Sequence, residues 1–382
     1  MTRVEGVPFV LLSAWRLKMK SKFKNLHSLL AGSGAVLMTI GGAQAADAII
    51  VEPEPVEYVR VCDMYGAGFF YIPGSETCLQ INGEVSVEYV SFHHHGEDDG
   101  TSNHEASVTG QIGFVASNET EYGTLTSDII LAFYRGSSKD EFSQTEGYHT
   151  NSGGESGLVK ATINIAGFRA GYDADGGGAW NRYAGEGYYD AIIDGLYSFH
   201  TAMFFEYGGS ISDFNYVVGI QDAVQTGTPG APDVYAGFNW AVGDLTLGAA
   251  VVHDSNGGSD VNGGDGGIAW RVRGDIELES VMPGLGFGAW YESDDGRTDY
   301  VKGHVWGVTA KAGLTDKVSA YGGFSRYDGL RTASGTDAST WTGGLLWAPV
   351  DGLEVQAEYS AFWSEENGGN GGAFALGITR SF

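Results

Sequence analysis

The alternation of side chains in residues 353–363 is the feature that most constrains how this chain can fold. Apolar or small residues occupy every second position of that stretch, and polar residues such as Glu354 and Glu358 lie between them. The same alternation recurs along the chain, for example at 81–89 and 234–242. A two-residue period is typical of β-strands that bury one face. The sequence therefore predicts an all-β protein.

The first 45 residues have the composition of a secretory signal peptide. Lys20, Lys22 and Lys24 precede an apolar run over 29–40, and small residues follow, ending in Ala-Gln-Ala at 43–45. This order of basic, apolar and small residues predicts cleavage after residue 45 and export of the rest. A second methionine at position 19 opens a more conventional signal, so the start is either Met1 or Met19, and with Met19 residues 1–18 would be a mis-assigned start.

The composition of the exported part excludes two classes of protein. Removing residues 1–45 removes six Lys and Arg and one acid from totals of 21 and 48, which leaves 15 basic and 47 acidic residues and a net charge of −32. Such acidity excludes nucleic acid as a partner, since phosphate binding needs a basic face. The 20 Tyr, 19 Phe and 9 Trp exclude an acidic disordered chain, because disordered chains are poor in aromatic residues.

The connections between the predicted strands separate a membrane barrel from a soluble sandwich. Long connections rich in Gly, Asp and Asn, such as 92–104 and 135–157, alternate with tight ones, such as 118–121, 166–167 and 243–244. Long extracellular loops and short periplasmic turns are typical of bacterial outer-membrane barrels. Aromatic residues near the predicted strand ends, for example Tyr89, fit the interfacial girdles of such barrels.

The strand count predicts a 16-stranded antiparallel transmembrane β-barrel over residues 79–382. Those 304 residues average 19 for each strand and its connection. Tilted strands need about 9–11 residues to span a bilayer, which leaves the remainder for loops. Residues 46–78 then form an N-terminal segment that we expect in the periplasm.

Cys62 and Cys78 are the two cysteines of the chain, and both lie in this N-terminal segment. An exported protein can keep a disulfide, so the two are predicted to pair. Closing a loop of this size would stabilise the fold by roughly 3 kcal/mol. A metal site or a catalytic thiol is the alternative, and neither has a nearby histidine to supply a ligand or a base.

The last predicted strand, residues 373–382, places Phe374, Leu376, Ile378 and Phe382 on one face. A terminal Phe after such alternation resembles the signal that the outer-membrane barrel-assembly machinery reads. Phe382 is therefore predicted to be both an assembly signal and the end of a strand that pairs with the one beginning near residue 79.

Two stretches resemble the porins of alphaproteobacteria, particularly the rhizobial type. The first is YVRVCDMYGAGFFYIPGSETCL at 58–79, and the second is ATINIAGF at 161–168, which looks like the family's fourth and fifth strands with their tight turn. The resemblance implies a homotrimer in the outer membrane, in contact with lipid and lipopolysaccharide. Each protomer would carry a water-filled pore for passive diffusion of small hydrophilic solutes and ions.

The resemblance also implies that the third loop folds into the barrel after the fifth strand and narrows the pore. This loop would cover residues 173–195, although its opening lacks the hydroxyl and aromatic residues common in the family. Candidate charges at the constriction are Asp173, Asp175, Arg182, Glu186, Asp190 and Asp194. Basic candidates on the facing pore wall are Arg169, Arg271, Arg273, Lys302 and Arg326.

Placement of charge would be the whole mechanism of such a pore, because a porin selects solutes by width and fixed charge. The excess of acids predicts a channel that favours cations. No phosphate-binding loop, HExxH zinc motif or exported nucleophile elbow is present in the sequence, so neither a cofactor nor enzymatic activity is predicted. The alternative from another class is an exported adhesin or structural protein built as a non-pore β-barrel or a β-sandwich.

Overall fold

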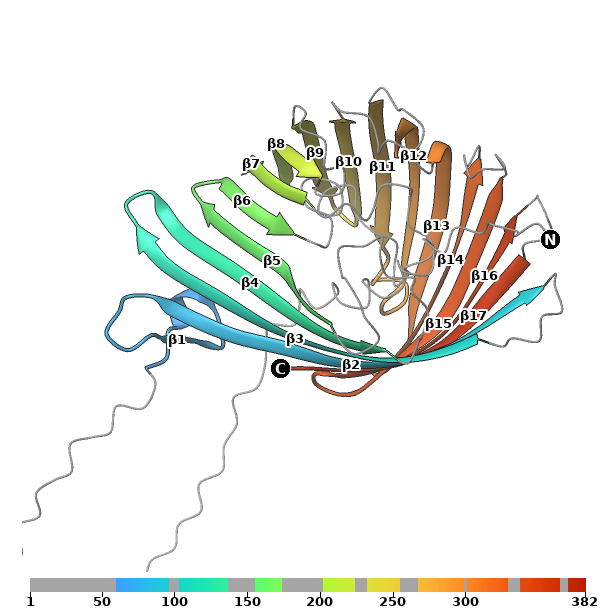
Figure 1. Cartoon of the computed structure of the whole chain (residues 1–382), viewed down its shortest axis with the longest axis horizontal. Helices are drawn as coiled ribbons and strands as arrows, with labels where there is room; N and C mark the ends of the chain where they lie inside the picture. The colour runs from blue at the N-terminus through green and yellow to red at the C-terminus, as the bar shows by residue number, and fades with distance from the viewer. Residues whose placement is uncertain are drawn as a thin grey trace, which may run out of the picture.

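The computed structural model is a single closed β-barrel with a small disulfide-linked segment at one end (Figure 1). It describes residues 60–95, 103–136, 155–173, 202–223, 232–254, 267–298, 301–328, 337–364 and 370–382. Within these ranges no helix has the length and apolar character needed to cross a membrane.

Sixteen of the seventeen strands form the wall of the barrel, and all sixteen pair antiparallel. In chain order they are β2 (Cys78–His95), β3 (Asn103–Thr120), β4 (Gly123–Gly136), β5 (Glu155–Ile165), β6 (Phe168–Asp173), β7 (Ala202–Ile211), β8 (Phe214–Ala223), β9 (Asp233–Val242), β10 (Leu245–Asp254), β11 (Gly267–Glu277), β12 (Gly286–Thr298), β13 (Val301–Thr315), β14 (Val318–Asp328), β15 (Ala338–Val350), β16 (Leu353–Ser364) and β17 (Asn370–Ser381).

The barrel closes because its last strand pairs with its first. β17 runs antiparallel to β2 over twelve residue pairs, from Asn370 opposite His95 to Ser381 opposite Glu84. Every other wall strand pairs with its neighbours in the sequence, as Figure 1 shows. This closure confirms the predicted 16-stranded antiparallel transmembrane barrel and rules out a β-sandwich, in which the sheets keep free edges.

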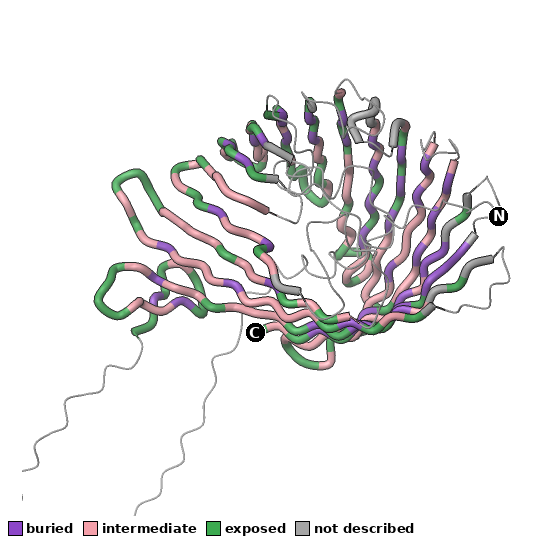
Figure 2. The backbone as a smooth tube through the Cα atoms, viewed as in Figure 1, coloured by how far each residue is buried: buried purple, intermediate pink, exposed green. Residues whose placement is uncertain are grey.

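Residues alternate between the two faces of the wall, as Figure 2 shows by the change of colour along single strands. On β17 the side chains of Phe374, Leu376 and Ile378 are exposed, whereas Ala373 and Ala375, which alternate with them, are buried. The exposed apolar side chains form the outer face of the barrel, which suits contact with lipid. The predicted alternation on β16 is confirmed, with Glu358 and Ser360 buried on the inner face.

The two ends of the barrel carry connections of different length. Seven turns at one end are described in full, and six of them are two residues long. The turn between β5 and β6 consists of Ala166 and Gly167, with φ of 50° and 85°. Two positive φ values fit the right-handed twist of a two-residue hairpin. A Cβ atom on Gly167 would lie 2.6 Å from the carbonyl oxygen of Gly208, so glycine is required there.

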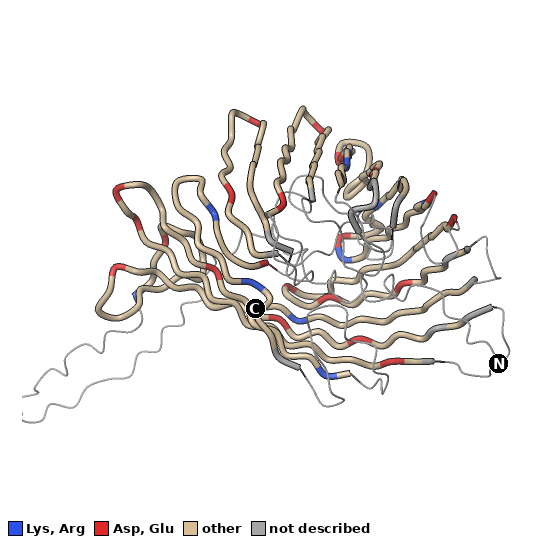
Figure 3. The backbone as a smooth tube through the Cα atoms, turned by 45° about the horizontal axis from the view of Figure 1, so that its top comes forward, with Lys and Arg blue, Asp and Glu red and all other residues tan. Residues whose placement is uncertain are grey.

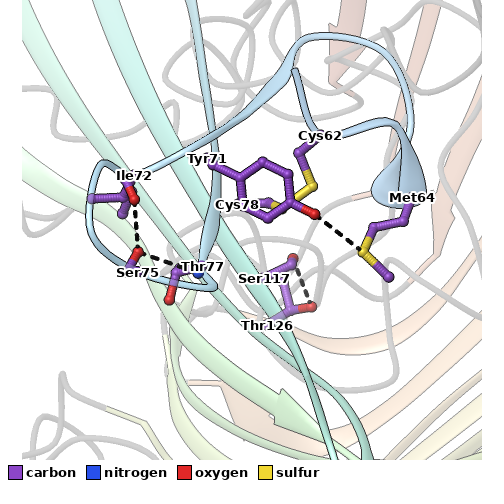
Figure 4. Close-up of a disulfide and its surroundings, with 9 residues drawn as sticks. All are labelled: Cys62, Met64, Tyr71, Ile72, Ser75, Thr77, Cys78, Ser117 and Thr126. Carbon is purple, nitrogen blue, oxygen red and sulfur yellow. Dashed lines mark hydrogen bonds between the residues drawn. A yellow bond between two sulfur atoms is a disulfide. The ribbon is translucent and has the colours of Figure 1, made fainter. Parts of the chain in front are cut away.

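The disulfide between Cys62 and Cys78 is present, as predicted, with Cα atoms 6.0 Å apart. Both cysteines are buried, and Figure 4 shows them beside Tyr71. The bond joins the 3-10 helix η1 (Asp63–Tyr65) and the short strand β1 (Phe69–Tyr71) to the first residue of β2. β1 pairs with the start of β2, so the segment lies at the end of the barrel that carries the short turns.

Tyr65 and Gln80 extend the contacts of this segment to the barrel wall. The Gln80 amide donates a hydrogen bond to the carbonyl of Ala67 at 3.0 Å. Partial burial and then the nearby Glu119 carboxylate on β3 raise the pKa of the Tyr65 phenol, which keeps its proton and donates a hydrogen bond to Glu119. The segment is thus held by polar contacts as well as by the disulfide.

Phe382 lies across the junction between β17 and β2. Its backbone exchanges two hydrogen bonds with Gly83, both at 3.0 Å. Its ring lies so close to Gly83 that a Cβ atom there would be 2.5 Å from the ring. The predicted pairing of the last strand with the first is confirmed, and Gly83 is the residue that leaves room for the aromatic ring.

Replacing both cysteines, as in Cys62→Ala with Cys78→Ala, should lower the free energy of unfolding by about 2–4 kcal/mol, since the cross-link no longer restricts the unfolded chain. The barrel itself should persist, because the pairing of its sixteen strands does not involve residues 60–77. Urea titrations followed by tryptophan fluorescence would measure the loss, and the wild-type protein treated with a reductant is the matched control. An unchanged urea midpoint, or a variant without a barrel, would contradict this account.

Candidate functional site

The inner face of the barrel is the candidate site, and strand register decides which side chains belong to it. We call this surface the inward wall. Its described acids are Glu84, Glu88, Glu105, Asp128, Asp173, Glu206, Asp233, Asp275, Glu277, Glu292, Glu354 and Glu358. Its described bases are Lys160, Arg169, Arg271, Arg273 and Lys311. Figure 3 shows that acidic positions are spread more widely over the strands than basic ones.

Arg169 on β6 is the centre of one charged cluster on the inward wall. Its guanidinium lies 2.8 Å from Asp173 and 3.4 Å from Glu206 on β7. The Tyr235 hydroxyl on β9 donates a hydrogen bond of 2.7 Å to the other Glu206 oxygen. The guanidinium also lies 4.6 Å from the centre of the Phe204 ring, within range for a cation–π contact. Three strands, β6, β7 and β9, therefore converge on one largely buried ion pair.

A second ion pair lies beside this cluster and was not predicted from the sequence. Lys160 on β5 lies 2.5 Å from Asp128 on β4. Lys160 is also the register partner of Asp173. The alternation of residues along β5 could have revealed this pair, because Lys160 lies on the same face of the strand as Thr162. Thr162 belongs to the stretch at 161–168 that resembles the porin family.

The strands β11, β12 and β13 carry the other bases of the inward wall. Arg271 and Glu292 are register partners, and both have no exposed surface. The Arg271 guanidinium lies 4.4 Å from the centre of the Trp290 ring. Arg273 binds Asp275 through two nitrogens, at 2.5 and 2.6 Å.

Lys311 on β13 continues this group of charges. Its amine lies 2.9 Å from the Glu277 carboxylate at the short-turn end of β11. Like Lys160, it was missed by the sequence analysis, although it shares the inward phase of Thr309. The four bases with a described ion pair thus have their acid on the wall beside them rather than across the lumen.

Hydroxyl groups line the inward wall from β14 round to β2. Ser325 and Thr340 lie 2.6 Å apart, as do Thr342 and Ser360. The Tyr321 hydroxyl donates a 2.5 Å hydrogen bond to Glu358. Ser86 on β2 and Thr379 on β17 continue the series across the closing junction at 3.1 Å. This part of the wall presents neutral polar groups together with a buried carboxylate.

An apolar cluster interrupts the polar character of the inward wall between β7 and β11. Its members are Phe204, Val217, Tyr235, Ala250, Val252 and Ala269. Each of these side chains is at most 4% exposed, although all of them lie on the inward wall. Apolar surface of this kind is stabilised by contact with other chain segments rather than by water in a lumen.

The structure assigns the candidate charges from the sequence to different places. Arg169, Arg271 and Arg273 lie on the inward wall, and their role at the pore stays a prediction. Asp173 is the last residue of β6 and not the start of a loop. The candidates outside the described residues are Asp175, Arg182, Glu186, Asp190 and Asp194, and the side chain of Lys302 in β13 is outside them too.

Arg326 was wrongly predicted to line the pore. It pairs in register with Trp306, which lies on the outer face in contact with the Phe324 ring. Its guanidinium binds Asp328 at 3.0 Å and Asp337 at 2.9 Å, near the long-connection end of β14. Arg326 therefore belongs to the outer face, because antiparallel register partners point to the same side of a sheet.

The inward wall offers fixed charges and hydrogen-bonding groups. Within the described ranges no three His, Cys, Asp or Glu side chains are grouped so that they could hold a metal ion. The charges are spread over many strands, and the described bases are engaged in structural contacts. Such a surface can attract, repel and orient solutes in water.

A closed barrel with an apolar outer face and a charged inner face is the architecture of porins. The family model described as "Porin subfamily" matches residues 47–371, so the chain belongs to that family. It is 36% identical over 249 residues to "Porin Omp2b" of Brucella suis biovar 1 (strain 1330), a match that covers 60% of this chain and 66% of that porin. The match thus covers just under two thirds of the length of that porin. The predicted resemblance to alphaproteobacterial porins is confirmed.

Solved structures share the fold at low sequence identity. The outer membrane channel DcaP of Acinetobacter baumannii has a TM-score of 0.59 at 12% identity, and the match covers 82% of this chain and 99% of that one. The anion-selective porin from Comamonas acidovorans has a TM-score of 0.55 at 14% identity, with 80% and 100% covered. The family and the fold support an outer-membrane β-barrel protein.

The substitution Arg169→Met should leave the Glu206 carboxylate without its cation while keeping an unbranched apolar stem on Phe204. Loss of this partly buried pair should lower the free energy of unfolding by about 1–3 kcal/mol. Urea unfolding would measure this loss, and Arg169→Lys, which keeps the charge, is the matched control. Equal stability of the wild type and Arg169→Met would show that the pair contributes nothing.

Proposed function

We propose that this chain forms a water-filled channel for passive diffusion of small hydrophilic solutes and ions across the outer membrane, with a preference for cations. The observation that carries the proposal is the closed 16-stranded barrel with its charged inner face. Barrels of this size are wide enough to hold an aqueous channel. Membership of the porin subfamily supports the same conclusion and implies a channel rather than an enzyme.

The preference for cations is supported by the balance of charge on the inward wall. The described wall carries many more carboxylates than basic groups, and its ion pairs neutralise the bases locally. A net negative lumen with low-dielectric walls concentrates cations and repels anions. The similar porin from Comamonas acidovorans is anion-selective, so selectivity depends on the side chains of each barrel and not on the fold.

The narrowest part of the pore is proposed to be formed by the third loop, residues 173–195, folded inward. The buried apolar cluster on β7 to β11 supports this, because a segment packed inside the barrel would cover it. Asp175, Arg182, Glu186, Asp190 and Asp194 would then add to the charge at the constriction, beside Arg169 and Asp173 on the wall.

The remaining parts of the proposal concern export and assembly. Residues 1–45 are proposed to be a cleaved signal peptide and 46–78 a periplasmic segment. The location of the described part of this segment, beside the short turns, supports a periplasmic place. We further propose a homotrimer, embedded among outer-membrane lipid and lipopolysaccharide and inserted by the barrel-assembly machinery.

An exported adhesin without a pore remains the alternative from another class. A barrel filled by apolar side chains would favour it. The inward wall instead has carboxylates and hydroxyl groups on most of its strands, which favours water in the lumen. Single-channel recording separates the two, since an adhesin would give no conductance steps.

In a planar bilayer under a potassium chloride gradient, the reversal potential should indicate that potassium permeates better than chloride. The variant with Glu84→Gln and Glu354→Gln should reduce this preference, because both residues are half-buried on the inward wall near the short-turn end. The preference should weaken in concentrated salt, since the screening length falls from about 10 Å at 0.1 M to about 3 Å at 1 M.

The matched control is Glu121→Gln with Asp213→Asn, which removes the same charge from exposed short turns at the same end of the barrel. It should keep the selectivity of the wild type. A reversal potential of anionic sign, or equal effects of the two double variants, would overturn the proposed role of the inward acids.

Deleting Phe382 should reduce the yield of folded barrel in the outer membrane more than it reduces the conductance of the molecules that do fold. The deletion removes both backbone hydrogen bonds to Gly83 at the closing junction. Heat-modifiable migration on gels would measure the yield. A normal yield in cells would argue against an assembly signal at this residue.

A further inference from the structure

Three buried polar atoms at neighbouring positions of β11, β12 and β13 have no hydrogen-bond partner in the described part of the protein. They are Nη1 of Arg273, the indole Nε1 of Trp290 and the hydroxyl oxygen Oγ1 of Thr309. Trp290 and Thr309 are each only 4% exposed. Buried polar groups are nearly always paired, because an unpaired one loses its hydration without compensation. Groups that the wall itself does not satisfy point to a ligand from the lumen.

Strand register brings the three atoms together in one patch of the inward wall. Two adjacent rows of inward positions form what we call the β11–β13 patch, with Arg273, Trp290 and Gly307 in one row and Asp275, Gly288 and Thr309 in the next. The rows are two residues apart on each strand, so their side chains point to the same face. The second row lies nearer the short turns.

Two glycines make room within the patch. A Cβ atom on Gly307 would lie 2.8 Å from Nε1 of Trp290, so the indole lies across this glycine. A Cβ atom on Gly288 would lie 2.6 Å from Oδ1 of Asp275 and 2.8 Å from Oγ1 of Thr309. Gly288 therefore forms a floor that a carboxylate oxygen and a hydroxyl oxygen flank from the two neighbouring strands.

The described charges in and beside the patch balance one another. The bases are Arg271, Arg273 and Lys311, and the acids are Glu292, Asp275 and Glu277, each a register partner or an ion-pair partner of one base. The patch thus offers N–H donors, a hydroxyl group and carboxylate oxygens without net charge. A neutral ligand that both donates and accepts hydrogen bonds suits this set, and every hydroxyl group of a sugar or polyol does both.

The lumen reaches the patch from the short-turn end of the barrel. Side-chain exposure rises in that direction along β11, from 7% for Arg273 to 19% for Asp275 and 41% for Glu277. Lys311, beside Glu277, is 23% exposed. A solute that enters from this mouth therefore meets the acceptors over Gly288 before it meets the deeper indole N–H.

We propose that the β11–β13 patch is a weak binding subsite for a neutral polyhydroxylated solute, such as a sugar, within the channel. The inference rests on the proposed function, because a solute reaches the inward wall only through a water-filled lumen. Hydroxyl oxygens of the solute accept hydrogen bonds from Arg273 and Trp290, and the Thr309 hydroxyl bonds a further one. Water satisfies the same groups between binding events, and a solute that reproduces its hydrogen bonds replaces it at little cost.

The test uses the full-length barrel in a planar bilayer in potassium chloride, with maltotriose as the probe. Binding is measured from the interruptions of the ion current that the sugar causes. Trp290→Phe with Thr309→Val should weaken binding about tenfold, because each substitution removes one hydrogen bond to the sugar and keeps the shape of the side chain. Thr309→Val alone, the smaller change, should weaken binding about threefold.

Trp306→Phe with Ser293→Ala is the matched control. It removes one indole N–H and one hydroxyl from the outer face of β13 and β12, the same two strands that carry the tested groups. It should bind maltotriose as the wild type does. Heat-modifiable migration and conductance in salt without sugar show that each variant folds, and they test the proposed channel separately from the subsite.

Four results would overturn the proposal. One is a conducting wild-type channel whose current maltotriose does not interrupt, and another is equal affinity of the wild type and the double variant. Displacement of maltotriose by inorganic phosphate would indicate an anion site at Arg273 instead. A lower urea midpoint for Thr309→Val would show that its hydroxyl stabilises the wall rather than serving a solute.

Discussion

The hydrogen bonds between β17 and β2 are the interaction on which the rest of the structure depends. Lipid offers no partner to a backbone N–H or C=O group, so a strand edge facing the membrane would cost several kcal/mol for each exposed group. Twelve register pairs remove that edge, and the backbone of Phe382 extends the pairing to Gly83. Closure also fixes which face of each strand points to lipid and which to the lumen.

Once the wall is closed, the inner face becomes a place where charges must find partners within a small volume. The chain meets this need with short-range pairs such as Arg169 with Glu206 and Lys160 with Asp128, each built across neighbouring strands. These pairs hold the bases against the wall. On the described part of the wall acids outnumber bases, so structural ion pairing and the proposed selectivity involve the same set of side chains.

Much of this could be predicted from the sequence, because alternation and turn residues are local signals. Arg326 shows where such prediction fails. Its strand, β14, contains Gly322, Gly323 and Ser325, which carry little information about which face is apolar. Pairing with Trp306 decides the face, and that partner lies on another strand. Lys160 and Lys311 were missed for the opposite reason, since the alternation showed which face they take but a lysine side chain is usually solvated.

The sequence by itself determined the period of the strands, their number, the alternation of long and short connections and the pairing of Cys62 with Cys78. Each of these depends on residues close together in the chain or on a choice with few alternatives. Only the tertiary structure decided which charges meet and which face Arg326 takes. The physical reason is that register between strands comes from hydrogen bonds between segments distant in sequence, and a shift by one residue exchanges the two faces.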